Sequence, residues 1–129
     1  MRGSADLSRH LLLRSGWSAV RASDPERYAC EGPGVAAEAC EYLIDGFPQL
    51  KAIAMDWLSL ATPHRIEEGI AAHQILCGVG RGDRYIIIIE DVDLSCLPSS
   101  LDRIYALPLF AEQADSSPCT VIAETSSTT

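Results

Sequence analysis

The chain has 129 residues, 47% of them apolar, which is the size and composition of one ordinary domain with a real core. Its 18 acidic and 10 basic side chains leave a net charge of −8. Because this charge repels phosphate groups, we expect no binding to nucleic acid or to anionic membranes. No apolar run approaches the ~20 residues that a membrane-spanning helix needs, and the N-terminus shows no targeting signal.

The five cysteines are odd in number and show no CxxC spacing. Secreted disulfide frameworks usually have an even set of cysteines in a shorter chain. These cysteines are therefore interpreted as small buried hydrophobic residues in a reducing compartment. The sequence favours a cytoplasmic protein.

Strand and helix patterns alternate along the chain. The first strand is expected at residues 10–15 (HLLLRS), and a long irregular stretch with turn signals begins at Gly16. A helix is expected at residues 35–45, with an apolar face formed by Val35, Ala39, Tyr42 and Leu43. Further strands are expected at residues 51–58, 85–89, 103–109 and 119–124. The run YIIII at residues 85–89 is the most apolar, so we expect it at the centre of the sheet.

A second helix is expected to begin with Thr62 as its N-cap and Pro63 at its first position. One face of this helix would carry Ile66, Ile70, His73 and Cys77. The predicted fold class is α/β, with a mixed sheet and two main helices. We expect a single domain over residues 10–125, between an N-terminal tail or tag at residues 1–9 and a disordered tail at residues 126–129.

Acidic residues directly follow the predicted strand at residues 85–89. Glu90 and Asp91 would lie at its carboxyl end, where sites gather in open α/β sheets. A solvated strand end is the simpler interpretation, and the pattern alone favours it. A lone His73 is likewise more often a core or boundary residue than a ligand. The glycine-rich segment at residues 78–83 follows a helix and precedes a strand, so it is interpreted as a connector and not as a phosphate loop.

Five segments, in order along residues 10–124, resemble segments of the cyclase family, which includes the kynurenine formamidases. Residues 11–18 (LLLRSGWS) are similar to the family's LLIRTGWS. Residues 47–60 (FPQLKAIAMDWLSL) are similar to its vGiDt-x-S strand, with Asp56 and Ser59 in the marked places. The other three matches are residues 67–76 (EEGIAAHQIL) with EEG-x-x-AH, residues 86–94 (IIIIEDVDL) with iiEdmdL, and residues 106–124 with lPl-x-x-x-g-x-DGsPctViAe.

The resemblance implies a metal-dependent hydrolase of amide or formamide bonds, similar to the arylformamidases. It implies the C-terminal half of the family's β/β/α fold, often assembled as an oligomer. It also implies that His73 and Glu90 occupy two metal-ligand positions for zinc or manganese. The pair should face a cleft lined in part by Asp56 and Ser59.

The sequence also departs from the family. The remaining metal ligands of the family come from an N-terminal motif, HxGTHxDxPxH, which this sequence does not contain, and no two of its three histidines are three or four residues apart. Ser116 and Ser117 stand where the family commonly has Asp-Gly. A catalytic zinc usually has three protein ligands and a water. We therefore expect weak or absent metal binding and no turnover by this chain alone.

Three interpretations follow. The chain is part of an enzyme that a complementing N-terminal half completes, or a non-catalytic binding or interaction module, or a structural remnant without activity. Loss of half a compact domain would expose a strand edge, and such edges are usually paired or covered. We therefore expect a homo-oligomer, most simply a two-fold dimer.

Overall fold

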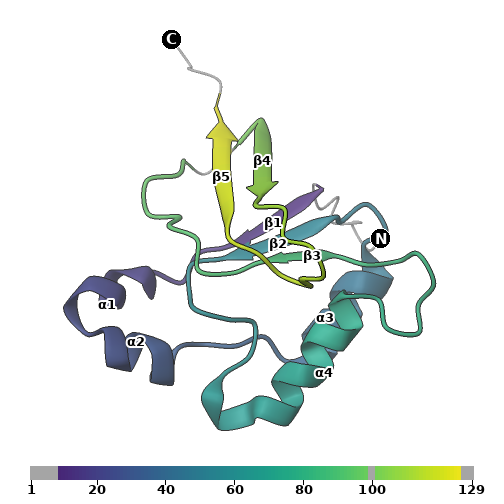
Figure 1. Ribbon diagram of the computed structural model, residues 1–129, viewed down its shortest axis with the longest axis horizontal. Coiled ribbons are helices and arrows are strands. Elements are labelled where there is room, and N and C mark those ends of the chain that lie inside the picture. Colours follow the sequence, from purple (N-terminus) through teal and green to yellow (C-terminus); the bar gives the residue numbers. More distant parts are fainter. Residues whose placement is uncertain (1–8, 99–100, 126–129) are drawn as a thin grey trace, which may run out of the picture. The chain divides into compact units, whose positions relative to one another are not determined.

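The computed structural model describes residues 9–98 and 101–125 (Figure 1). These residues form two compact units that divide between Ser95 and Cys96. The predicted single domain over residues 10–125 stays a prediction, and the predicted tails lie, apart from Arg9, outside the described residues. Among the described residues, no helix combines the length and apolar character needed to cross a bilayer.

The first unit is built on a parallel sheet. Its strands are β1 (His10–Leu13), β2 (Ala52–Met55) and β3 (Ile87–Ile89), in the order β1-β2-β3. All four residues of β2 are buried, which fits a strand with a neighbour on each side. The strands were expected at these places, but β3 is an edge of this sheet and not its centre. Its apolar content predicts a strand but not full burial, since Ile87 is 52% exposed, and the order of strands depends on the connections between them.

Two helices lie side by side along one face of this sheet: α3 (Ala37–Gly46) and α4 (Ile66–Leu76) (Figure 1). When parallel strands follow one another in order, right-handed crossovers place successive helices on the same face. The buried residues are Cys40 and Ile44 on α3, and Gly69, Ala72 and Leu76 on α4. All of them except Gly69 belong to the same core cluster as Leu50 and as Ile53 and Met55 of β2.

The apolar faces predicted for these helices are correct only in part, since Val35 and Leu43 do pack against the core. Tyr42 on α3, and Ile66 and Ile70 on α4, are more than half exposed. On α4 the packed face is the one with small residues, because Gly69 and Ala72 let the helix approach its neighbours closely. The helical period alone does not choose between two neighbouring apolar stripes.

The stretch after β1, predicted to be irregular, contains two short helices, α1 (Ser18–Ser23) and α2 (Pro25–Glu31). Asp24 caps α2 by accepting a hydrogen bond of 3.0 Å from the amide of Arg27, and Pro25 takes the first helical position. Both helices are too short to show a clear periodic pattern, and α1 has no side-chain cap at its N-terminus.

A 3₁₀ turn, η1 (Pro63–Arg65), precedes α4. Thr62 is the predicted cap, and its hydroxyl accepts from the amide of His64 at 3.2 Å. After α4, a loop with positive φ at its glycines leads to β3. A Cβ on Gly78 would lie 2.3 Å from the carbonyl oxygen of Arg84, so only glycine fits there. The guanidinium of Arg84 in turn caps the end of α3 by donating to the carbonyls of Ile44 and Phe47.

The second unit contains an antiparallel pair, β4 (Arg103–Pro108) and β5 (Cys119–Glu124), in which Tyr105 lies opposite Ile122. Both strands lie where the sequence predicts them. The α/β class is therefore confirmed. The described strands form two small sheets, one parallel and one antiparallel, and not the single mixed sheet that was expected.

Candidate functional site

His73 and Glu90 meet at the surface of the first unit. His73 lies on α4, and Glu90 directly follows β3. The imidazole Nε2 lies 3.3 Å from the carboxylate Oε1. The two side chains are 36% and 33% exposed, so solvent and a small ion can reach them. The expected convergence of these two side chains is confirmed.

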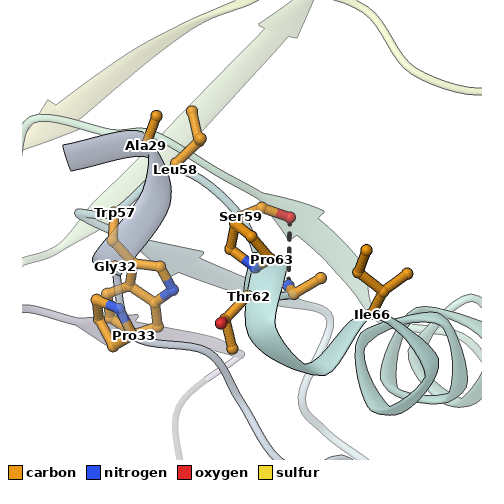
Figure 2. A pocket seen from close by; sticks show the side chains of 10 residues that line it. Ala29, Gly32, Pro33, Trp57, Leu58, Ser59, Thr62, Pro63 and Ile66 are labelled. Atoms are coloured by element: carbon orange, nitrogen blue, oxygen red, sulfur yellow. Dashed lines mark hydrogen bonds between the residues drawn. The ribbon is translucent and has the colours of Figure 1, made fainter. Parts of the chain in front are cut away.

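The segment that leaves β2 holds the Glu90 carboxylate in place. The hydroxyl of Ser59 donates to Oε1 at 2.9 Å, and the amide of Leu60 donates to the same oxygen at 2.6 Å. Ser59 Oγ also accepts from the amide of Ala61 at 3.2 Å, the bond that is dashed in Figure 2. Glu90 Oε2 receives no hydrogen bond from the residues that the structure describes. This oxygen is therefore free for another partner.

The other nitrogen of the His73 ring fixes its tautomer. Nδ1 lies 2.8 Å from the carbonyl oxygen of Gly69, one turn earlier on α4. A carbonyl oxygen only accepts hydrogen bonds, so Nδ1 carries the hydrogen. In the neutral ring, Nε2 then has a lone pair directed at the carboxylate. Nε2 of His73 and Oε1 of Glu90 are then two acceptors that face one another. A proton or a metal cation between them would remove their repulsion.

Gly69 brings α4 against the segment that carries Ser59 and Leu60. A Cβ on Gly69 would lie 2.2 Å from the Cβ of Ala61. The glycine therefore allows a closer approach than any other residue would. This approach places the ring of His73 within reach of Glu90.

Asp56 has a different environment from the one expected. Its carboxylate is buried and accepts from the amide and the hydroxyl of Ser15, at 2.8 and 2.7 Å, and from the amide of Gly16 at 2.7 Å. Both oxygens are used to tie the end of β1 to the end of β2. Its role as a residue that lines a cleft beside Glu90 stays a prediction, whereas Ser59 does contact Glu90.

Sequence reasoning missed the partners of Asp91. The hydroxyl of Tyr28 on α2 donates to Asp91 Oδ1 at 2.6 Å, and the guanidinium of Arg21 on α1 lies 3.0 Å from Oδ2. Burial, followed by the hydrogen bond to Asp91, raises the pKa of the Tyr28 phenol above its ordinary value. Asp91 itself has a φ of 57°. The two helices thus hold the backbone immediately after Glu90.

The donor set matches two positions of a zinc or manganese site, because imidazole nitrogen and carboxylate oxygen are both common ligands. Within the described parts of the chain, no group of three or more His, Cys, Asp or Glu side chains is placed to hold a metal ion. His73 and Glu90 are called the half-site below; their residue types fit two ligand positions, and that they hold a metal stays a prediction.

Comparison with known proteins identifies no relative of this chain. No family model matches the chain, and neither the curated proteins nor the solved structures contain a significant match.

Proposed function

We propose that this chain supplies His73 and Glu90 to the metal centre of an amide or formamide hydrolase similar to the arylformamidases of the cyclase family. The metal is zinc or manganese. The sequence resemblance supports the reaction class, and the geometry of the pair supports its part in the centre.

The observation that carries the proposal is the relation between Nε2 and Oε1. Zinc bonds of about 2.0–2.2 Å at the tetrahedral angle separate two ligand atoms by about 3.4 Å. The two atoms lie 3.3 Å apart. A charge-assisted bond between an imidazolium and a carboxylate is usually shorter, at about 2.7–2.9 Å. The spacing and the lone pair on Nε2 therefore favour a shared cation over a direct ion pair.

The proposal requires ligands from another polypeptide segment. A catalytic zinc site usually has three protein ligands and a water, and the pair supplies two. We propose that a segment with a histidine-rich motif completes the centre. The pair alone binds metal weakly, and this chain by itself does not turn over an amide.

The test has two parts. Cobalt(II), a spectroscopic substitute for zinc, is titrated into the purified chain, and its visible absorption is recorded. We expect weak binding that is lost in His73→Ala and in Glu90→Gln, and that is kept in the control His64→Ala, which changes the exposed histidine of η1. The chain is then mixed with an N-terminal half of a cyclase-family protein, and hydrolysis of an aryl formamide is measured.

We expect turnover only in the mixture, and only with His73 and Glu90 intact. Equal cobalt binding by wild type and both site variants would contradict the half-site. Turnover by the pure chain would contradict the need for a second segment.

A second candidate is an interaction module that associates with itself. The observation in its favour is the outer face of α4, where Ile66 and Ile70 are more than half exposed although apolar. Exposed apolar groups of this kind mark contact surfaces when they are contiguous. Light scattering should then give the mass of a two-fold dimer, and Ile70→Glu should give a monomer. A monomeric mass of the wild type at high concentration would rule this candidate out.

A further inference from the structure

A small apolar pocket lies beside the half-site, at the carboxyl end of β2. Its walls include Trp57, Leu58 and Ser59 from the segment after β2, and Pro33, Pro63 and Ile66 from elsewhere in the unit (Figure 2). In open α/β sheets, ligands bind outside the carboxyl ends of the strands. The cavity volume is about 190 Å³. A dry cavity of about 150 Å³ accepts benzene, so this pocket has room for one six-membered ring.

The pocket contains one polar group that has no partner. Trp57 is 6% exposed, and its indole Nε1 is buried without a hydrogen-bond acceptor among the described residues. Figure 2 shows this nitrogen directed toward the side of the pocket formed by Thr62 and Pro63. A buried N–H group without an acceptor destabilises the folded state. An acceptor from a ligand would remove that cost.

The other polar side chains of the lining each have a partner. Ser59 Oγ donates to Glu90 and accepts from Ala61, and Thr62 Oγ1 accepts from the amide of His64, which leaves the O–H of Thr62 as a second donor. None of the residues that line the pocket is charged. A charged ligand would lose its hydration there without finding a counter-charge. The chemistry of the lining therefore selects a neutral molecule.

The pocket is also largely preformed. The rings of Pro33 and Pro63 form part of its walls, and proline has a fixed φ. Trp57 Nε1 has almost no exposed surface, so a ligand would reach it only when a side chain of the wall moves. An apolar pocket with a small number of polar groups is typical of a small-molecule site.

We propose that this pocket binds a compact, neutral, apolar molecule with one hydrogen-bond acceptor of the carbonyl type, which Trp57 Nε1 recognises. This site does not depend on metal at His73 and Glu90. Because Ser59 lines the pocket and also donates to Glu90, the ligand would lie one side chain away from the half-site.

The experiment uses two probes of nearly equal shape, cyclohexanone and methylenecyclohexane, which differ by an acceptor. Each is titrated into the full ¹⁵N-labelled chain, and the two indole N–H signals are followed by NMR. Trp17→Phe and Trp57→Phe assign the signals. Trp17 is the matched control because its Nε1 already donates to the carbonyl of Tyr28 at 3.2 Å.

We expect cyclohexanone to move the Trp57 indole signal downfield and to leave the Trp17 signal in place. Methylenecyclohexane should move the Trp57 signal far less. Trp57→Phe should weaken cyclohexanone binding about tenfold, which corresponds to one hydrogen bond, and should weaken hydrocarbon binding less. Ala29→Leu, which fills the pocket from α2, should abolish binding of both probes.

A Trp57 indole signal that does not respond to cyclohexanone in the wild-type chain would overturn the proposal, whether or not Trp57→Phe folds. Equal responses to the two probes would also overturn it, because recognition would then not involve the indole N–H.

Discussion

The ring of His73 and the carbonyl of Gly69 share a hydrogen bond of 2.8 Å within α4, and this bond leaves Nε2 as the nitrogen that faces Glu90. Free neutral histidine favours the opposite tautomer, with hydrogen on Nε2. The environment of His73 therefore reverses the intrinsic preference of its side chain. Metal-bound histidines are commonly oriented in the same way, by a carbonyl that accepts from the second ring nitrogen.

The first prediction concerns this tautomer. Long-range ¹⁵N–¹H NMR of the neutral ring should show His73 with hydrogen on Nδ1, whereas the exposed His64 should show the usual form. Zinc should shift Nε2 of His73 and leave His64 unchanged. Hydrogen on Nε2 of neutral His73 would mean a direct bond to Glu90, and the half-site would lose its main support.

The second prediction concerns Ser59, which donates to Glu90 Oε1. Ser59→Ala removes this donor but leaves the amide of Leu60 in place. We expect a loss of about 1 kcal/mol in the free energy of unfolding. Because partners of ligands tune metal affinity, cobalt(II) binding should weaken about tenfold or more. The control is Ser23→Ala, an exposed serine at the end of α1 that is remote in sequence from the site. Equal cobalt affinity in Ser59→Ala and wild type would show that this contact does not position the carboxylate.

The third prediction concerns the buried carboxylate of Asp56. Its two oxygens accept three hydrogen bonds from Ser15 and Gly16. Asp56→Asn replaces one accepting oxygen by an NH₂ group, which would face a donor. We expect a loss of about 2–3 kcal/mol in the free energy of unfolding in urea. Asp83→Asn, at an exposed loop position, should change stability little. A stable Asp56→Asn variant would indicate that the ends of β1 and β2 are held by other contacts.

Much of the fold is predictable from the sequence because strands leave a local mark, even β4, most of whose residues are exposed. The strands at residues 10–13, 52–55 and 103–108 lie within runs of branched or apolar residues. Strand order and helix facing are not local properties. Whether Ile66 or Ala72 points into the core depends on which face of α4 can approach the sheet, and this depends on Gly69.

The candidate site is likewise predictable from the sequence only in part. The pairing of His73 with Glu90 comes from the resemblance to the cyclase family, because the pattern alone favours a solvated strand end for Glu90 and a core or boundary position for His73. The bond between Tyr28 and Asp91 could not be predicted, since 63 residues separate them and α2 is too short for a periodic pattern. Asp56 was expected inside a strand at residues 51–58, whereas β2 ends at Met55 and Asp56 directly follows it. The direction of its side chain depended on the turn at Ser15, which has no signature of its own.

The fourth prediction concerns Gly69. Replacement of glycine by alanine inside a helix normally stabilises a protein by about 1 kcal/mol. In Gly69→Ala, however, the new methyl group would lie 2.2 Å from the Cβ of Ala61. We expect this overlap to dominate and to cost about 1–3 kcal/mol in the free energy of unfolding. It should also move α4 away from Ser59 and reduce cobalt binding.

Gly46→Ala is the matched control, because its added Cβ meets no atom within 4 Å at the end of α3. Gly69→Ala should therefore lower the free energy of unfolding, whereas Gly46→Ala should raise it or leave it unchanged. A stabilised Gly69→Ala would show that α4 moves without cost, and that the close approach is not needed for the pair.

The fifth prediction concerns Cys40, the buried member of five cysteines that are all reduced. Burial on α3 raises the pKa of its thiol from 9.0 to about 11, because the core does not solvate a thiolate. An aromatic disulfide reagent at pH 8 should therefore modify four thiols quickly, namely Cys30, Cys77, Cys96 and Cys119, and the fifth only as fast as the chain unfolds.

The sign of the effect of pH on stability follows from the same shift in the pKa of the Cys40 thiol. Above pH 9 the unfolded chain releases the Cys40 proton while the folded chain keeps it, so this contribution to stability is present below pH 9 and is lost as the pH rises toward 11. Cys40→Ala should remove this part of the pH dependence. Rapid modification of all five thiols in the native protein would show that α3 opens readily, and the core beneath the half-site would then be less firmly packed than its buried residues indicate.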